Sequence, residues 1–169
     1  MAMNTTRAVE TSETIRDDVG MAWRIKASFV KYIAGMNDGA VRILPGSSVT
    51  PNGEYYFTLE HYDFDSETLT GVVKFRGGVE FSGHFGMLNL SLTDPWISFR
   101  EGTALISAVT GAGERVEFCA VAAAAPLIDG DVLMWRDIPT FLTSVGEPLF
   151  NNVYRGNEPF APLTVRIPA

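Results

Sequence analysis

Apolar residues recur at helical spacing between Met21 and Gly35. One face of this segment carries residues at i, i+4, i+7, i+8 and i+11, namely Ile25, Phe29, Tyr32, Ile33 and Met36. This spacing predicts an amphipathic helix over about residues 21–35, ended by Gly35 and the glycine-containing cluster that follows it. A second apolar row lies opposite, at Trp23, Ala27, Val30 and Ala34. We therefore expect cover on two sides: the sheet on one, and a loop, another subunit or a flat apolar ligand on the other.

Tyr32 is the polar exception on the first face. A buried hydroxyl without a hydrogen-bond partner costs about 1–3 kcal/mol, so the phenol needs a partner. A backbone carbonyl would satisfy it. A metal ion, or a histidine from elsewhere in the chain, would do so as well.

Most of the remaining chain alternates in the manner of short strands. The predicted strands are Val41–Leu44, Tyr55–Tyr62, Leu69–Phe75, Val79–Gly83, Met87–Leu92, Trp96–Arg100, Ala104–Val109, Arg115–Val121, Val132–Trp135 and Leu163–Ile167. Glycine-containing pairs such as Asn52-Gly53 and Asp129-Gly130 separate them, and such pairs are typical of hairpin turns. A second helix is predicted near residues 145–153, where Ser144 and Glu147 have capping-box spacing. The pattern favours a mainly β fold, an antiparallel β-sandwich-like domain with two short α-helices.

Length and composition indicate one domain with a short tail. Residues 1–20 lack periodicity and are expected to form a flexible N-terminal tail, and residues 21–169 the domain. With 13 basic and 20 acidic residues and no basic cluster, the chain is not expected to bind nucleic acid. The longest apolar run, Phe118–Ile128, is too short to span a bilayer, so no membrane insertion is expected. The chain as written has no signal peptide and would be cytoplasmic, and a trimmed chain would look the same. The single cysteine, Cys119, is expected to act as a small buried hydrophobe.

The two histidines fall in different contexts. His84 lies between glycines, in Gly83-His84-Phe85-Gly86 after a strand. A bulge there can redirect the side chain, although a turn histidine bonded to backbone would have the same pattern. His61 lies among alternating carboxylates, but the EF-hand spacing fails because Thr68 occupies the glycine position, so a solvated strand end is favoured. Nucleophile-elbow, phosphate-loop and paired metal-histidine motifs are missing from the sequence.

Three motifs in order resemble the HtaA domain family of actinobacterial haem-uptake proteins. The first, W-x(5)-F-x-x-Y, joins Trp23, Phe29 and Tyr32. The second, F-x-G-x-V-x-F-x-G-H-x-G, runs from Phe75 through Phe81 to His84 and Gly86. The third, F-x(3)-Y-x-G, joins Phe150, Tyr154 and Gly156. The resemblance covers about residues 22–168, and the order and spacing of the motifs are more specific than any one of them.

The resemblance implies a β-rich domain that binds ferric haem b through an axial tyrosinate. It assigns the iron ligand to Tyr32 and the supporting histidine to His84, and Tyr154 matches the tyrosine of the last motif. We expect the haem to contact Ser28, Phe29, Ile33, Met36, Phe81, His84 and Tyr154. A phenol titrates near pH 10, so binding at neutral pH requires ferric iron to displace its proton, and a hard phenolate oxygen favours Fe(III).

The implied role is haem uptake, transfer or storage without catalysis, with other haem-transfer proteins as further partners. The family is usually secreted or held at the cell surface. Two alternatives remain at this point: a β-sandwich interaction module without a ligand, and a haem-dependent enzyme such as a weak peroxidase.

Overall fold

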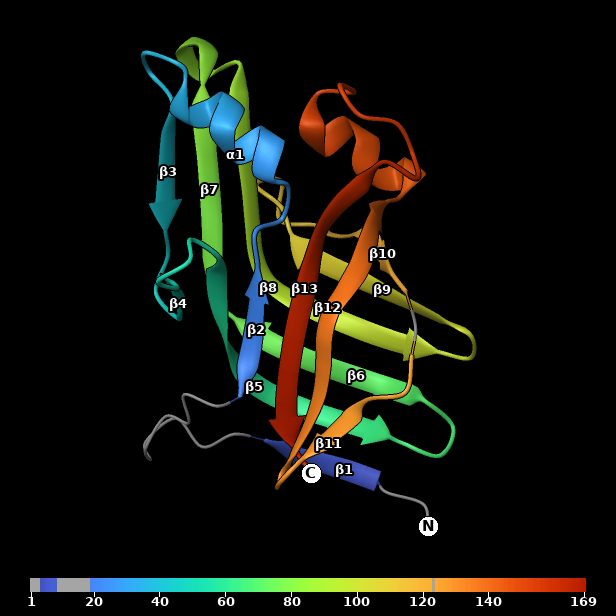
Figure 1. Ribbon diagram of the computed structural model, residues 1–169. Helices are drawn as coiled ribbons and strands as arrows, with labels where there is room; N and C mark the ends of the chain where they lie inside the picture. The colour runs from blue at the N-terminus through green and yellow to red at the C-terminus, as the bar shows by residue number, and fades with distance from the viewer. Residues whose placement is uncertain (1–3, 9–18, 123) are drawn as a thin grey trace.

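The computed structural model describes residues 4–8, 19–122 and 124–169, and only the backbone of residues 4–8. Within these ranges the chain forms thirteen strands, one α-helix and two short 3₁₀ segments (Figure 1). In chain order the elements are β1 (Asn4–Ala8), β2 (Gly20–Trp23), α1 (Ala27–Ala34), β3 (Ala40–Ile43), β4 (Ser47–Val49), β5 (Tyr55–Asp65), β6 (Thr70–Arg76), β7 (Gly78–Gly83), η1 (His84–Gly86), β8 (Leu88–Arg100), β9 (Thr103–Val109), β10 (Arg115–Val121), β11 (Leu127–Asp129), β12 (Val132–Leu142), η2 (Ser144–Phe150) and β13 (Pro159–Pro168).

Eight of the strands close on one another. The antiparallel order is β5-β2-β13-β12-β10-β9-β8, and β6 completes the ring by pairing with both β8 and β5. Inward-pointing side chains of the strands fill the ring with large apolar groups, among them Phe57, Phe64, Phe75, Ile97, Ile106 and Trp135. The predicted mainly β, antiparallel, sandwich-like class is confirmed.

Several strands run further than their sequence pattern indicated, and β8 and β12 do so through bulges. Met87–Leu92 and Trp96–Arg100 were predicted as separate strands, but β8 continues through both. The turn-like Asp94-Pro95 pair lies in a bulge, where Asp94 has φ 49° and the register with β9 shifts. β12 likewise passes Asp137 (φ 48°) and Pro139 through two register shifts. Bulges thus absorb residues that in isolation favour turns.

The predicted helix over residues 21–35 is wrong at its start. Residues 20–23 form β2, in which Trp23 pairs with Leu163 of β13, and only Ala27–Ala34 are helical. Ile25 has φ 69° and lies in the connection, although it is buried as its spacing suggested. The second apolar row does not form a covered face, because Ala27 and Ala34 are exposed. Strand pairing of residues 20–23 has overridden their helical periodicity.

The second predicted helix is a 3₁₀ segment, η2, with a different cap. Ser144 was expected to begin it, but the hydroxyl of Thr143 accepts the hydrogen bond from the Gly146 N–H. Glu147 instead accepts a hydrogen bond from the N–H of Gly156 at 2.8 Å. The segment ends at Asn151, whose φ is 54°.

The expected tail differs in the part that the structure describes. Asn4–Ala8 forms strand β1, which pairs with β5, and Val19 belongs to the core. Residues 1–3 and 9–18 of the expected tail lie outside the described residues. In the described part of the chain, none of the helices has the length and apolar character needed to cross a bilayer.

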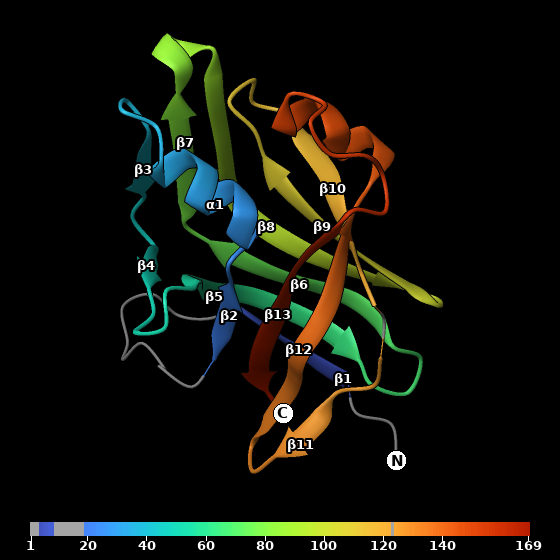
Figure 2. The same ribbon diagram turned by 45° about the horizontal axis from the view of Figure 1, so that its top comes forward.

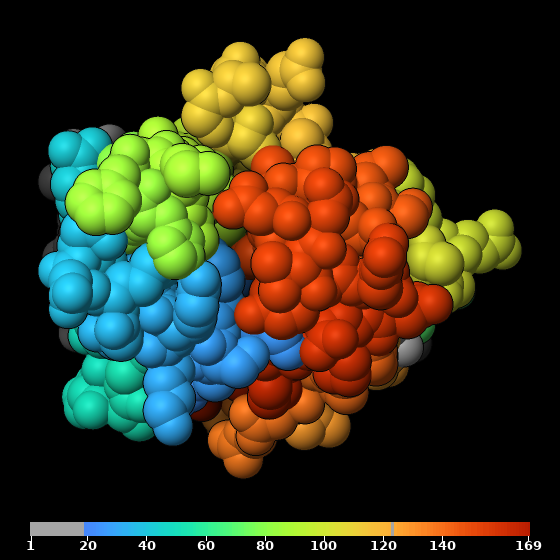
Figure 3. Space-filling model, turned by 90° about the horizontal axis from the view of Figure 1, so that it is seen from above, coloured from blue at the N-terminus to red at the C-terminus, as the bar shows by residue number. Residues whose placement is uncertain are grey.

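One end of the ring is built up by three segments. The β7–β8 hairpin extends beyond the ring and carries η1 at its tip, and α1 packs beside it (Figures 1 and 2). η2 stands opposite. Seen from above, α1 and the hairpin tip lie on one side of a furrow and η2 lies on the other (Figure 3).

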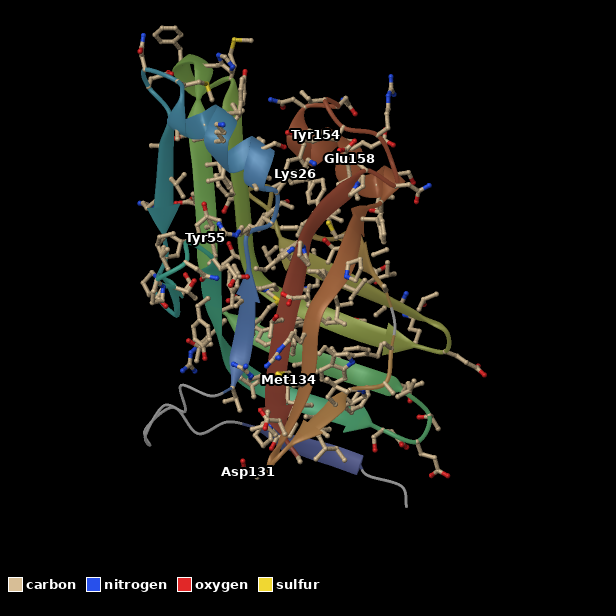
Figure 4. The ribbon with its side chains drawn as sticks, in the orientation of Figure 1. Lys26, Tyr55, Asp131, Met134, Tyr154 and Glu158 are labelled. Atoms are coloured by element: carbon tan, nitrogen blue, oxygen red, sulfur yellow. The ribbon has the colours of Figure 1, made fainter. Side chains whose placement is uncertain are left out.

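Below this furrow, Lys26 connects the α1 side to the segment that follows η2. Its ammonium donates to Glu158 Oε2 at 3.0 Å and to the Pro159 carbonyl at 2.9 Å, and it lies 5.0 Å from the centre of the Tyr154 ring (Figure 4). Lys26 immediately precedes α1, and Glu158 immediately precedes β13. Its side chain is only 12% exposed, so solvent screens the pair less than an ordinary surface pair.

We predict that Lys26→Met lowers the free energy of unfolding by about 1 kcal/mol, because it keeps the apolar stem and removes the shielded pair. Arg100→Met is the matched control, since the Arg100–Glu117 pair has side chains 58% and 40% exposed. Its effect should stay within about 0.5 kcal/mol. Urea denaturation of both variants measures this, and equal losses would contradict the role of Lys26.

Cys119 supports a second prediction. It is buried in β10, and burial raises the pKa of its thiol well above the ordinary value. The reactive thiolate is therefore scarce in the folded protein. A thiol reagent at pH 8 should leave the native protein unmodified and label it rapidly in denaturant. Native labelling as fast as that of the unfolded chain would show that the core at Cys119 is open.

Candidate functional site

The furrow at the open end contains an apolar slot of about 410 Å³. One wall comes from α1 and the hairpin tip, and the other from η2 and the residues after it. The lining residues are Phe29, Tyr32, His84, Leu88, Phe150, Asn151, Val153 and Tyr154. This volume falls within the roughly 300–1,000 Å³ range of small-molecule sites.

Tyr32 and His84 meet at the edge of this slot. The Tyr32 hydroxyl lies 2.5 Å from His84 Nε2, a short hydrogen bond between residues 52 positions apart. This contact decides between the partners that the sequence left open, because the phenol meets a histidine ring. It also shows that His84 Nε2 bonds to the Tyr32 side chain, whereas a turn histidine was expected to bond to the backbone. Tyr32 is 51% exposed, so its oxygen is not sealed in the core.

An unusual turn aims His84 at the slot. His84 and Phe85 both have left-handed backbone conformations, with φ of 51° and 55°, and Gly86 follows at 87°. For residues other than glycine this conformation costs about 1–2 kcal/mol each. Two N–H groups of the turn donate to Asp38: that of His84 to Oδ1 at 3.3 Å, and that of Phe85 to Oδ2 at 2.7 Å.

Met36 sits directly beneath this turn. A Cβ at Gly83 would come within 2.7 Å of Met36 Cε, so glycine permits the close approach of the methionine side chain. Met36 therefore supports the hairpin tip and does not line the slot.

The floor of the slot is aromatic. The Phe29 ring makes edge-to-face contacts with Phe81 and with Phe150, both at 5.2 Å between ring centres. Phe150 also contacts Tyr154 at 6.0 Å. α1 and η2 are thus joined through apolar contacts that hold the two walls at a fixed separation.

The predicted site residues divide into three groups. Phe29, Tyr32, His84 and Tyr154 line the slot together. Ile33 and Phe81 are fully buried and pack behind it, as Met36 does. Ser28 is exposed on α1, one turn before Tyr32, outside the lining residues.

Sequence reasoning did not assign Leu88, Phe150, Asn151 and Val153 to the slot. Leu88 was placed only in the predicted strand Met87–Leu92. Phe150 opens the third motif, and Asn151 and Val153 follow η2 within that motif. Asp38 was read only as part of the cluster that ends the helix. Its long-range bonds to the turn leave no periodic signal in the sequence.

Other polar clusters offer less. Among the described residues, no three His, Cys, Asp or Glu side chains gather as a metal site. A neighbouring groove of about 510 Å³ shares Asn151 with the slot, but its lining mixes Glu80 with neutral polar residues such as Asn89 and Ser91. The slot is therefore the place where an apolar cavity and a potential metal donor coincide. A phenol beside an imidazole can present an ionised oxygen to a hard cation carried by a flat apolar molecule.

Comparison with solved structures shows the same fold. The C-terminal domain of HtaA from Corynebacterium glutamicum superposes with a TM-score of 0.73 at 21% identity, covering 88% of this chain and 94% of that domain. The N-terminal domain of that HtaA gives 0.71 at 22% identity, covering 93% and 100%. The haem-binding protein HtaB of the same organism gives 0.63 at 16% identity, covering 98% and 96%.

Sequence comparison identifies the family directly. None of the curated protein sequences matches the chain. The family model described as Htaa matches residues 18–166, which include the slot, both of its walls and the closed ring beneath it. The chain belongs to the HtaA family.

Proposed function

We propose that this chain binds ferric haem b in the slot, with the Tyr32 phenolate as the axial ligand, for haem uptake, transfer or storage. The observation that carries the proposal is the 2.5 Å contact between the Tyr32 oxygen and His84 Nε2 at the edge of an apolar cavity. A bound haem would supply a ferric centre that favours a hard, anionic oxygen ligand.

The Tyr32 oxygen is suited to this role by its surroundings. It projects from the rigid helix α1 and remains half exposed, so a metal carried by a ligand can reach it. The Tyr32 oxygen also contacts the His84 ring, which can accept the phenol O–H in a hydrogen bond before haem binds and donate an N–H to the phenolate when iron is bound. Such a partner orients a metal ligand and tunes its basicity.

The walls fit a flat apolar body. Phe29, Leu88 and Phe150 are buried side chains that line the slot, and Val153 completes the opposite lip. Phe81 supports Phe29 from behind through an edge-to-face contact, and Ile33 is fully buried on the same helix. Ser28 and Tyr154 are the polar groups that we assign to the haem carboxylates, from α1 and from the segment after η2.

The proposed role is carriage without catalysis. Membership of the HtaA family supports haem uptake, and one similar structure is that of a haem-binding protein. The half-exposed ligand suits exchange with other haem-transfer proteins, because haem can leave without the core opening.

Tyr32→Phe tests the ligand. Wild-type protein titrated with haemin should give a Soret band together with a phenolate-to-iron charge-transfer band. The variant should lose the charge-transfer band. Loss of a hydrogen-bond partner of a metal ligand lowers affinity about 10–100-fold, and loss of the ligand itself should lower the affinity for haemin by more than that.

Tyr62→Phe is the matched control for this titration, since it removes a phenol from β5, outside the slot. It should bind as the wild type does. An unchanged spectrum in Tyr32→Phe would refute Tyr32 as the ligand.

His84→Ala tests the supporting role. The charge-transfer band should persist at a shifted wavelength, because the phenolate remains but loses its hydrogen bond, and affinity should fall about 10–100-fold. His61→Ala, in β5, is the control and should match the wild type. If His84→Ala retained both the wild-type spectrum and the wild-type affinity, the hydrogen bond would have no part in binding.

A further inference from the structure

The turn that carries His84 packs on Met36 at its base, but its outer side chains are not packed. Phe85 is 98% exposed and Met87 is 83% exposed, so their side chains do not anchor the hairpin tip. The backbone of His84 and Phe85 is nevertheless left-handed, a conformation that L-residues rarely adopt. Some other contact must favour this conformation over the alternatives open to an exposed turn.

Asp38 supplies that contact. Successive N–H groups in such a turn converge and form a concave site for an anion. In this chain the anion is the Asp38 carboxylate, with one oxygen accepting from each N–H. The hydrogen bond from the Phe85 amide holds the pKa of the Asp38 carboxyl below its ordinary value. The side chain is therefore ionised at neutral pH.

The position of Asp38 in the chain connects it to the other half of the site. It lies six residues after Tyr32, in the connection between α1 and β3. The segment that carries Tyr32 and Asp38 therefore contacts the turn at two points. The Tyr32 oxygen bonds to the His84 ring, and the Asp38 carboxylate accepts from the His84 N–H. Between these two points, the Met36 side chain packs against Gly83 at the base of the turn.

We propose that Asp38 is a positioning residue that holds the His84 turn in its left-handed form and thereby keeps Nε2 of His84 on the Tyr32 oxygen, so that it controls how firmly haem is retained. This inference rests on the proposed function and adds a residue to it. Asp38 acts through the turn that carries His84 and is not among the residues that line the slot. Its removal should weaken the hydrogen bond to the ligand while leaving the ligand in place.

The first experiment uses the protein without haem. The ¹⁵N chemical shift of His84 Nε2 reports the hydrogen bond to Tyr32 directly. In Asp38→Ala this shift should move toward the value seen in Tyr32→Phe. Asp38→Asn should give a smaller change, because the amide oxygen can still accept one of the two N–H groups. Asp129→Asn removes one exposed carboxylate from β11, at the far end of the molecule, and should leave the shift unchanged (Figure 1).

The second experiment measures loss of haem from the loaded protein to excess apomyoglobin. Asp38→Ala should release haem faster, by about tenfold or less, as expected for a group that acts through a partner of the ligand. The same substitution in the His84→Ala background should add nothing, since the turn then has no ring to position. If Asp38→Ala did not fold, Asp38→Asn would carry both measurements.

Two results would overturn the inference. One is a wild-type His84 shift and haem-loss rate in both Asp38 variants. The other is an equal acceleration by Asp38→Ala with and without His84. A wild-type protein that fails to bind haemin would instead refute the proposed function, and the haem-free shift would still judge the positioning role of Asp38.

Discussion

The contact between Tyr32 and His84 is the interaction on which the site depends. Tyr32 comes from helix α1 and His84 from the hairpin tip. The contact therefore exists only if α1 and the β7–β8 hairpin keep a fixed relative position. The closed ring of strands provides that support, because β8 is itself a ring strand and β7 pairs with β8 and follows the ring strand β6. A rigid scaffold that presents side chains from its open end is a common arrangement for binding sites.

The two walls of the slot are joined by different forces at different depths. Aromatic contacts of Phe29 with Phe81 and Phe150 join them at the floor. Lys26 adds a shielded ionic contact to Glu158 lower down. The rim has neither, and its Phe85 and Met87 side chains project into solvent. Contacts between the walls therefore hold the slot at its base, while the side chains at its mouth are free to move. This arrangement suits a ligand that must enter and leave.

Much of the fold could be predicted from the sequence, for reasons that differ from element to element. Strand β10 was predicted with its observed bounds, Arg115–Val121, even though its pairing with β9 shifts register between Glu117 and Cys119. The predicted strands were interrupted between Leu92 and Trp96 and stopped at Trp135, whereas β8 and β12 continue past these points through bulges that only strand pairing reveals. The helix was placed too early because pairing of Trp23 with β13 is a tertiary effect. In the site, the motifs pointed to Tyr32 and His84, but the carboxylate of Asp38 depends on a long-range contact that spacing cannot reveal.

Resonance Raman spectroscopy of the haemin-loaded wild-type protein tests the central claim most directly. Excitation in the charge-transfer band should enhance tyrosinate ring modes and an iron–oxygen stretch. The ring modes should shift when the protein is made with ring-deuterated tyrosine. Loaded protein whose spectrum contained no tyrosinate modes, and was unchanged by that labelling, would contradict a Tyr32–iron bond.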